Sequence, residues 1–259
     1  MISINLSMPV ILEVINLTKT YDNDVHAVKG ISFSVNRGEV FGILGPNGAG
    51  KTTTLEMIEG LRSITSGDVI LDGIKTTDQP YLIKQRIGIQ LQSSAFFQNL
   101  KLTELLEMFA DLYGSTINPL ELLADVGLKD KAHFLVKKLS GGQKQRFSIA
   151  TTLVNRPVMV FLDEPTTGLD PQARRNLWDL ITQIKSRGTT VIITTHYMEE
   201  AKFLCDRVAI MDDGKIVALD SPDQLIRQLL SRGFKPHTEV PPATLDDVFI
   251  DLTGKTLRD

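Results

Sequence analysis

The stretch that decides the fold runs from Val40 to Leu55 and reads Val-Phe-Gly-Ile-Leu-Gly-Pro-Asn-Gly-Ala-Gly-Lys-Thr-Thr-Thr-Leu. An apolar run long enough for one buried strand comes first, and the pattern G-x-x-x-x-G-K-[ST] then fills residues 45–52 before a helix predicted over 53–61. In this context the backbone N–H groups of the loop and the positive N-terminal end of the helix together bind phosphate. The alternative, a glycine-rich turn with a surface lysine, leaves the preceding strand unexplained. The stretch therefore predicts a nucleoside triphosphate site.

The polar residues of this loop have separate expected roles. Lys51 supplies a cation for the β- and γ-phosphates of ATP, and Thr52 supplies a hydroxyl group for Mg²⁺. The loop residues expected to contact the nucleotide are Gly45, Pro46, Asn47, Gly48, Ala49, Gly50, Lys51, Thr52 and Thr53.

Length and composition set outer limits. A chain of 259 residues that is 42% hydrophobic can bury a core in one domain with an inserted subdomain. The formal net charge of −3 argues against nucleic acid as the main partner, and the single cysteine, Cys205, excludes an internal disulfide and has the pattern of a core residue. Residues 1–9 lack the basic start of a signal peptide, and no apolar run approaches the roughly 18–20 residues that span a bilayer. We expect a soluble chain that reaches a membrane only through a partner.

The first part of the chain has hairpin patterns. Strands are predicted over 10–17 and 28–35, and a second hairpin over 67–74. Tyr21 lies in the first predicted turn, where an aromatic side chain is ordinarily a packing residue.

A further strand is predicted over 86–92 and contains Gln90 and Gln92. Because alternation along a strand puts both glutamines on one face, periodicity does not decide which of them faces a site. Leucines at helical spacing then fill residues 93–138, which indicates a helical insertion between two strand-bearing portions.

The segment Leu139-Ser140-Gly141-Gly142-Gln143 precedes a helical run over residues 144–153. A serine followed by two glycines at the start of a helix leaves N–H donors unobstructed, which would make a second anion site. Taken alone, the same three residues are equally typical of a flexible helix cap.

Two carboxylates follow a buried strand predicted over 158–162. In a P-loop protein the first, Asp163, holds Mg²⁺ directly or through water, and the second, Glu164, orients or deprotonates the attacking water. The alternative is a solvated strand end, which the five apolar residues in front of the pair disfavour.

His196 stands between a strand predicted over 190–194 and a helix over 197–204. A lone histidine at a helix start is usually structural. This one follows a strand of the same predicted sheet as Asp163 and Glu164, which favours a catalytic role. Beyond residue 220, an appended amphipathic helix over 244–252 is expected to dock on its own domain or on a partner.

Taken together and in this order, these motifs resemble those of the nucleotide-binding subunit of ATP-binding-cassette (ABC) transporters. The resemblance covers about residues 10–220. The matching segments are the P-loop 45–52, the Q-loop residue Gln92, the LSGGQ signature 139–143, Walker B 158–164, the D-loop 168–170, the switch histidine His196 and the adenine-stacking aromatic Tyr21. One departure is Leu91, where the family often has proline before the Q-loop glutamine.

The resemblance implies an α/β fold. It implies a P-loop NTPase (RecA-like) core with a mostly parallel central sheet, an N-terminal antiparallel β-subdomain and an inserted α-helical subdomain. The implied division is an N-terminal extension 1–9, a nucleotide-binding core 10–92 and 155–220, an inserted helical subdomain with the signature loop 93–154, and a C-terminal helical tail 221–259.

The resemblance also implies a mechanism. In the family, two copies pair head to tail, and ATP lies between the P-loop of one and the signature loop of the other. Nucleotide contacts then extend to Tyr21, Ser140, Gly141, Gly142, Gln143 and Asp170; Mg²⁺ is held by Thr52, Gln92 and Asp163; and catalysis falls to Glu164 and His196 with Lys51 and Gln92.

The tail over 245–249 is similar to that of ATPases serving drug, antibiotic or polysaccharide exporters. A peripheral subunit at the cytoplasmic face of a membrane, held by an integral-membrane permease and without a nucleic-acid partner, is therefore implied. Two alternatives stay open. A soluble cassette ATPase of translation, DNA repair or iron–sulfur assembly would usually bring a second cassette or a long coiled coil, and Glu164 and His196 argue against a non-hydrolysing, nucleotide-gated binding module.

Overall fold

The structure is a computed structural model that describes residues 9–22, 24–91 and 96–234. Residues up to Leu225 form one compact unit, and a second unit begins at Ile226, within helix α8 (Pro222–Ser231). Both sheets lie in the first unit. Among the described residues, no helix has both the length and the apolar character that crossing a bilayer requires.

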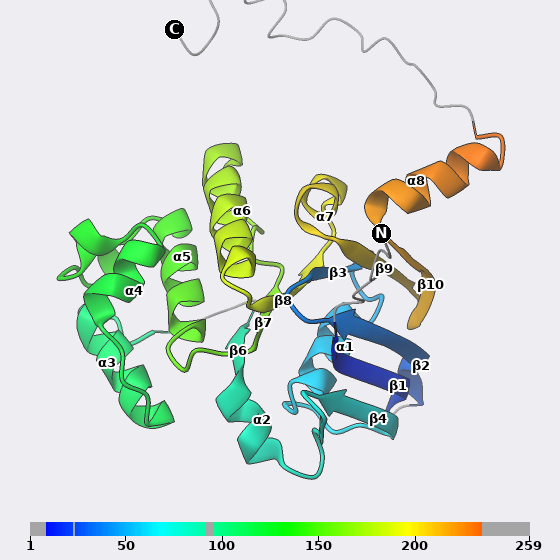
Figure 1. Cartoon of the computed structure of the whole chain (residues 1–259), viewed down its shortest axis with the longest axis horizontal. Coiled ribbons are helices and arrows are strands. Elements are labelled where there is room, and N and C mark those ends of the chain that lie inside the picture. Colours follow the sequence, from blue (N-terminus) through cyan, green and yellow to red (C-terminus); the bar gives the residue numbers. More distant parts are fainter. Residues whose placement is uncertain (1–8, 23, 92–95, 235–259) are drawn as a thin grey trace, which may run out of the picture. The chain divides into compact units, whose positions relative to one another are not determined.

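A six-stranded sheet forms the centre of the first unit (Figure 1). Its strand order is β10-β9-β3-β8-β7-β6, and all neighbours are parallel except β10, which pairs antiparallel with β9. The strands are β3 (Val40–Leu44), β6 (Ile87–Gln90), β7 (Met159–Asp163), β8 (Thr190–Thr195), β9 (Arg207–Asp212) and β10 (Lys215–Asp220). The mostly parallel sheet confirms the predicted α/β fold.

A separate antiparallel sheet has the strand order β2-β1-β4-β5. Its strands are β1 (Val10–Tyr21), β2 (Val25–Asn36), β4 (Ser66–Leu71) and β5 (Ile74–Lys75). The first hairpin is longer than predicted. Tyr21 ends strand β1 instead of lying in the turn, because its backbone pairs with Val25 at the start of β2.

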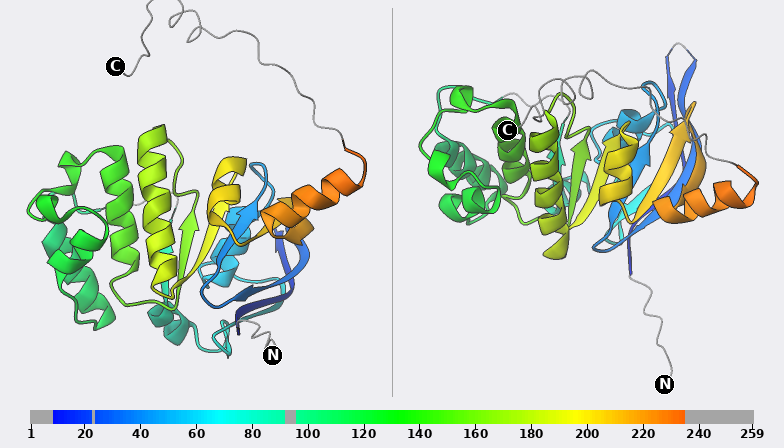
Figure 2. Two further views of the ribbon diagram at one scale, coloured as in Figure 1. Left: turned by 45° about the horizontal axis from the view of Figure 1, so that its top comes forward. Right: turned by 90° about the horizontal axis from the view of Figure 1, so that it is seen from above.

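Helices cover both faces of the central sheet. Figure 2 shows α5, α6 and α7 side by side along one face, and α1 contacts β7 from the other. The helices of the first unit are α1 (Lys51–Ile58), α2 (Pro80–Arg86), α3 (Leu102–Tyr113), α4 (Pro119–Asp125), α5 (Gly141–Thr152), α6 (Pro171–Ser186) and α7 (Met198–Leu204). The predicted helical insertion thus contains α3 and α4, followed by two short 3₁₀ turns over 129–131 and 136–138.

The core consists of two apolar clusters, one on each face of the central sheet. Val160 and Leu162 of β7 belong to the cluster under α5, α6 and α7, whereas Met159 and Phe161 belong to the cluster that includes α1 and the antiparallel sheet. Strand alternation therefore buries both faces of β7, as its uninterrupted apolar sequence predicts. Cys205 is buried in the first cluster, where burial raises the pKa of its thiol.

Several element ends differ from the predicted ones. Helix α1 begins at Lys51, two residues before the predicted start, so Lys51 and Thr52 lie in its first turn. Helix α5 begins at Gly141 because the side chain of Ser140 caps it. The strand predicted over 86–92 is described up to Gln90, and Gln92 lies outside the described residues.

Candidate active site

The carboxyl ends of three neighbouring strands meet at the candidate site. Strand β3 pairs with β8 as far as Thr195, and β8 pairs with β7 as far as Asp163. The P-loop follows β3, His196 follows β8 and Glu164 follows β7. Because parallel strands end at one edge of the sheet, segments that are more than a hundred residues apart converge there.

The P-loop folds tightly over the end of β3. A Cβ atom at Gly45 would lie 2.1 Å from the backbone oxygen of Met211, and one at Gly50, where φ is +98°, would lie 2.5 Å from the backbone oxygen of Ala27. Both positions therefore require glycine. Helix α1, which follows, has no side-chain cap and no acidic residue in its first turn. Its first N–H groups are open to an anion, and this geometry fits a polyphosphate.

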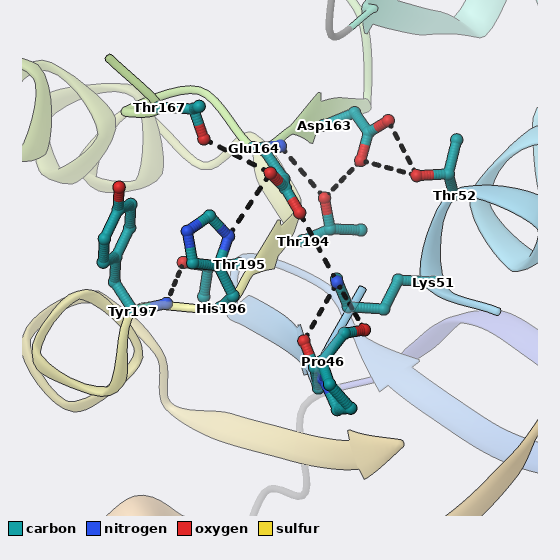
Figure 3. Close-up of polar contacts among 11 residues, drawn as sticks. Pro46, Lys51, Thr52, Asp163, Glu164, Thr167, Thr194, Thr195, His196 and Tyr197 are labelled. Carbon is teal, nitrogen blue, oxygen red and sulfur yellow. Dashed lines mark hydrogen bonds and ion pairs between the residues drawn. The ribbon is translucent and has the colours of Figure 1, made fainter. Parts of the chain in front are cut away.

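Lys51 points across the mouth of the loop (Figure 3). Its Nζ donates to the backbone oxygens of Gly45 at 2.9 Å and Pro46 at 3.1 Å, and lies 3.4 Å from Glu164 Oε1. The lysine side chain is only 5% exposed. A buried cation beside open N–H groups suits the phosphate oxygens of a nucleotide.

Asp163 is held by two hydroxyl groups. Thr52 Oγ1 donates to Asp163 Oδ2 at 3.1 Å, and the Thr194 hydroxyl donates to Asp163 Oδ1. Burial raises the pKa of Asp163, although these two hydrogen bonds act in the opposite direction. A threonine hydroxyl and a carboxylate next to a phosphate-binding loop are oxygen ligands of the kind that Mg²⁺ prefers. The residues present therefore fit a magnesium ion.

Glu164 occupies the centre of the site. Its backbone has a φ of 46°, and its N–H donates to Thr194 Oγ1 at 3.0 Å. Its Oε2 accepts a hydrogen bond from Thr167 Oγ1 at 3.2 Å and lies 3.3 Å from His196 Nδ1. Figure 3 shows the carboxylate between Lys51 and the imidazole. The left-handed backbone turns the carboxylate away from the strand and toward the P-loop.

These groups face a cavity of about 560 Å³. Its lining combines P-loop residues with the two side chains predicted to act on water: Ala27, Asn47, Gly48, Gly50, Lys51, Thr52, Thr53, Glu164, Thr167 and His196. The structure therefore brings the P-loop residues together with Glu164 and His196 around one cavity, and Asp163 lies next to it through its bond from Thr52.

A comparison with protein families identifies the family of this chain. The family model described as ABC transporter matches residues 28–167, just over half of the chain. The chain belongs to the ABC transporter family. The relatives and solved structures that it resembles are named as ATP-binding proteins and ATP-binding cassettes.

The relatives that it resembles include subunits of export systems. The chain is 46% identical over 200 residues to the fluoroquinolones export ATP-binding protein of Mycobacterium tuberculosis, across 77% of this chain and 66% of that protein. It is 35% identical to Nod factor export ATP-binding protein I of Burkholderia orbicola, across 94% of this chain and 97% of that protein. The chain thus spans slightly less than two thirds of the mycobacterial relative.

Among solved structures, the chain is similar to a dimeric ATP-binding cassette in a post-hydrolysis state bound to ADP and Pi. The two share 30% identity with a TM-score of 0.74, across 82% of this chain and 98% of that one.

Tyr21, the predicted adenine-stacking residue, lies close to the P-loop helix of this ABC cassette. Its hydroxyl is 3.4 Å from Thr53 Oγ1, and the cations of Lys19 and Arg62 lie 5.3 Å and 5.4 Å from the centre of its ring. The ring is therefore tied to helix α1 while remaining partly exposed. Its contact with adenine stays a prediction.

The signature loop, residues 139–143, lies apart from the P-loop cavity. Ser140 and Gln143 form a capping box at the start of α5, in which Ser140 Oγ accepts from Gln143 N at 3.4 Å and Gln143 Oε1 accepts from Ser140 N at 3.0 Å. Gly141 is exposed, with open space beside its Cα. None of residues 139–143, all of which the structure describes, lines the P-loop cavity.

Asp170 also has a local partner. Its Oδ1 accepts from Ala173 N at 2.8 Å and so caps helix α6. Gln92 lies outside the described residues, whereas the competing Gln90 is buried, and its Oε1 has no hydrogen-bond partner within the described part of the chain. The metal-holding and catalytic roles predicted for Gln92 therefore stay predictions.

Two threonines were missed by sequence reasoning. Thr194 binds both Asp163 and the backbone of Glu164, and Thr167 binds the Glu164 carboxylate. Thr167 lies three residues after Glu164 in a polar loop, a spacing that could have suggested it. Thr194 reaches Asp163 through strand pairing, and the sequence alone gives no register between β7 and β8.

Proposed function

We propose that this cassette hydrolyses ATP between two copies of the chain and thereby drives a separate membrane permease that exports its substrate. The single observation that carries the proposal is the meeting of Lys51, Glu164 and His196 around one cavity at the end of the parallel sheet, where Thr52 also lines the cavity and donates to Asp163. A binding module that never hydrolyses nucleotide would need no carboxylate held against the phosphate site.

Each side chain has a role in the hydrolysis. The P-loop amides and Lys51 bind the β- and γ-phosphates and stabilise the charge that develops on them. Glu164 orients the attacking water and accepts its proton, and His196 contacts the same water and the γ-phosphate. The Thr167 hydroxyl holds the Glu164 carboxylate in its rotamer.

The Mg²⁺ site belongs to the same proposal. Thr52 and Asp163 would hold the ion, with Gln92 as a third predicted ligand. When bound, Mg²⁺ supplies positive charge that neutralises the phosphate oxygens. Thr194 fixes the Asp163 carboxylate for this purpose.

Dimerisation is proposed because the signature residues at the start of α5 do not line the cavity at the start of α1. The P-loop cavity is not lined by the chain's own signature residues, so Ser140, Gly141 and Gly142 are available to the nucleotide of a second copy. A two-fold pair then has two equivalent sites. ATP holds the pair together, and hydrolysis releases it. Asp170, in the D-loop that starts α6, would face the same interface.

Export is proposed from the relatives, whose names assign two of them to the export of fluoroquinolones and Nod factor. An exported cargo requires an integral-membrane permease, and the cassette would be held by it at the cytoplasmic face. No observation favours a cassette ATPase of translation, DNA repair or iron–sulfur assembly.

The Glu164→Gln variant tests the catalytic assignment. We expect it to lower kcat for ATP by about 100-fold or more, because the amide cannot accept a proton, while ATP binding persists. ATP and Mg²⁺ should then trap the variant as a dimer, which size-exclusion chromatography with light scattering would detect. The matched control is Glu199→Gln, which changes an exposed carboxylate on α7.

Near-normal hydrolysis by Glu164→Gln would remove this residue from the catalytic role.

Coupling to a membrane permease is tested separately by co-purification from membranes. A multispanning protein that accompanies the tagged chain, and stimulates its ATPase activity, supports the transporter assignment; a purely soluble partner would contradict it.

A further inference from the structure

Helices α6 and α7 carry an unusual group of buried polar atoms. Arg174 Nε of α6, Glu200 Oε2 of α7 and His196 Nδ1, just before α7, are all buried and have no hydrogen-bond partner within the residues that the structure describes. His196 Nδ1 does lie 3.3 Å from Glu164 Oε2, but without hydrogen-bonding geometry. A hydrogen bond at Nδ1 therefore does not fix the orientation of the imidazole.

Aromatic packing holds this ring instead. The Tyr197 ring lies against the imidazole of His196, with 4.1 Å between the ring centres. In Figure 3 the imidazole lies between the Tyr197 ring and the Glu164 carboxylate. The backbone at Tyr197 is fixed in turn, because its N–H donates to Thr195 Oγ1 at 3.0 Å.

Helix α6 covers the tyrosine. The guanidinium carbon of Arg174 lies 4.6 Å from the centre of the Tyr197 ring, within the range of a cation–π interaction. One turn further along α6, Trp178 Nε1 donates to Glu200 Oε1 at 3.0 Å inside the core. Positions 174 and 178 share a helix face, so α6 contacts the segment after β8 at two successive levels.

We propose that Arg174 and Tyr197 are positioning residues that set the orientation of His196 toward Glu164. The guanidinium group of Arg174 packs on the Tyr197 ring, and this ring packs on the imidazole and keeps it directed toward the Glu164 carboxylate. Asp170 of the D-loop caps the start of helix α6, so the same contact connects the D-loop to the histidine through this helix. This inference rests on the proposed ATPase function, because the positioned group is His196.

The first test compares kcat and KM for ATP in four variants of the full chain. Arg174→Gln and Tyr197→Leu should each lower kcat about threefold to tenfold while KM stays within about twofold, because the P-loop contacts are unchanged. Tyr197→Phe keeps the ring and should retain activity. Arg175→Gln, at the adjacent exposed arginine, should match the unmodified chain.

A second control concerns aromatic packing in general. Phe203 of α7 stacks on Trp178 with 5.0 Å between ring centres, on the same helix pair. Phe203→Leu removes a ring from this pair without touching His196. The kcat of Phe203→Leu should therefore stay unchanged. If aromatic packing on α7 had only a structural role, the kcat values of Phe203→Leu and Tyr197→Leu would both fall.

The decisive test uses the His196→Ala background. If Arg174 and Tyr197 act through the imidazole, adding Arg174→Gln or Tyr197→Leu to His196→Ala should change kcat by less than about twofold. Further losses equal to those in the unmodified chain would overturn the proposal. So would a Tyr197→Phe variant as impaired as Tyr197→Leu.

The two levels of inference fail in different ways. An unmodified chain that does not hydrolyse ATP, even with its membrane partner, would contradict the proposed function. Normal hydrolysis by the unmodified chain, Arg174→Gln and Tyr197→Leu alike would contradict only the positioning role. Should Tyr197→Leu fail to fold, the Arg174→Gln variant still decides, because its side chain is partly exposed and keeps most of its aliphatic stem.

Discussion

Two helix starts in this cassette have sequences suited to phosphate, and they differ in what surrounds them. The start of α1 has no side-chain cap and faces a cavity that Lys51, Glu164 and His196 also line. The start of α5 is capped by Ser140 and Gln143 and does not line that cavity. The α1 start therefore has the catalytic side chains of its own chain beside it, whereas none of residues 139–143 lines the cavity with them.

This difference supports the proposal that each chain contributes one half to each of two sites. The capping box stabilises the start of α5 without a ligand. The exposed backbone N–H of Gly141 stays open to a phosphate group from another copy. The α1 start has no side-chain cap, so its first N–H groups are open to the phosphates of a nucleotide. In the proposed arrangement, catalysis depends on the pairing of two chains.

Removing the cation from the α1 side should have the largest effect. Lys51→Ala leaves the P-loop amides in place but deletes the charge next to the γ-phosphate. We expect kcat/KM for ATP to fall by about 100-fold or more. The control is Lys84→Ala, an exposed lysine of α2, and a steady-state ATPase assay compares the two. Unchanged hydrolysis by Lys51→Ala would contradict the P-loop assignment.

A charge on the α5 side should have a smaller but selective effect. A side chain at Gly141 meets nothing within 4 Å, so Gly141→Asp should fold. Its carboxylate favours the helix start but repels phosphate. We expect kcat to fall about 10-fold or more, ATP affinity of the isolated chain to stay within about twofold, and the Tm to stay equal or rise.

Gly141→Asn is the matched neutral control for this variant and should keep most of the activity. Calorimetric titration with ATP and a thermal scan separate binding from turnover. If Gly141→Asp weakens ATP binding by the isolated chain, the signature loop acts within its own copy, contrary to the comparison of the two helix starts.

Features of the fold and of the site that follow a local sequence pattern could be predicted, whereas contacts that depend on strand register or helix packing could not. The P-loop, Asp163 and Glu164 were predictable because each follows an apolar strand, and parallel strands end at one edge. A helix cap at Ser140 was one of the two interpretations of the sequence, but the return bond from Gln143 was not predicted, although the spacing of Ser140 and Gln143 fits a capping box. The bond from Thr194 to Asp163 depends on strand register, and the pairing of Arg174 with Tyr197 depends on how α6 packs. Neither leaves a local pattern in the sequence.

Burial of Glu59 was equally invisible in the sequence. Glu59 follows the last residue of α1, its backbone N–H donates to carbonyl oxygens of that helix, and the residue is 2% exposed. Burial first, and then the negative charges of Asp163 and Glu56, raise its pKa from 4.5 to about 8. The α1 side of the comparison therefore contains a carboxyl group that is protonated near neutral pH.

The last prediction concerns stability and not activity, and it rests on the protonation of this group. Because the folded chain binds a proton that the unfolded chain has lost, the contribution of Glu59 to the free energy of unfolding should fall as pH rises from about 4.5 to about 8, by up to about 1.4 kcal/mol per pH unit. Glu59→Gln cannot ionise and should gain stability relative to the unmodified chain between pH 5 and pH 8. Urea denaturation at both pH values measures this, with Glu107→Gln, an exposed carboxyl of α3, as the control. An unmodified chain whose stability rises over this range in step with Glu59→Gln would contradict the assigned protonation.

The most direct test of the two-halves arrangement mixes two inactive variants. Lys51→Ala chains lack a working P-loop but keep the signature loop, whereas Gly141→Asp chains keep only the P-loop. In a head-to-tail pair of one of each, one composite site is intact, so an equal mixture should recover up to about a quarter of the unmodified ATPase activity per chain. A mixture no more active than the average of the two separate variants would contradict catalysis across the pair.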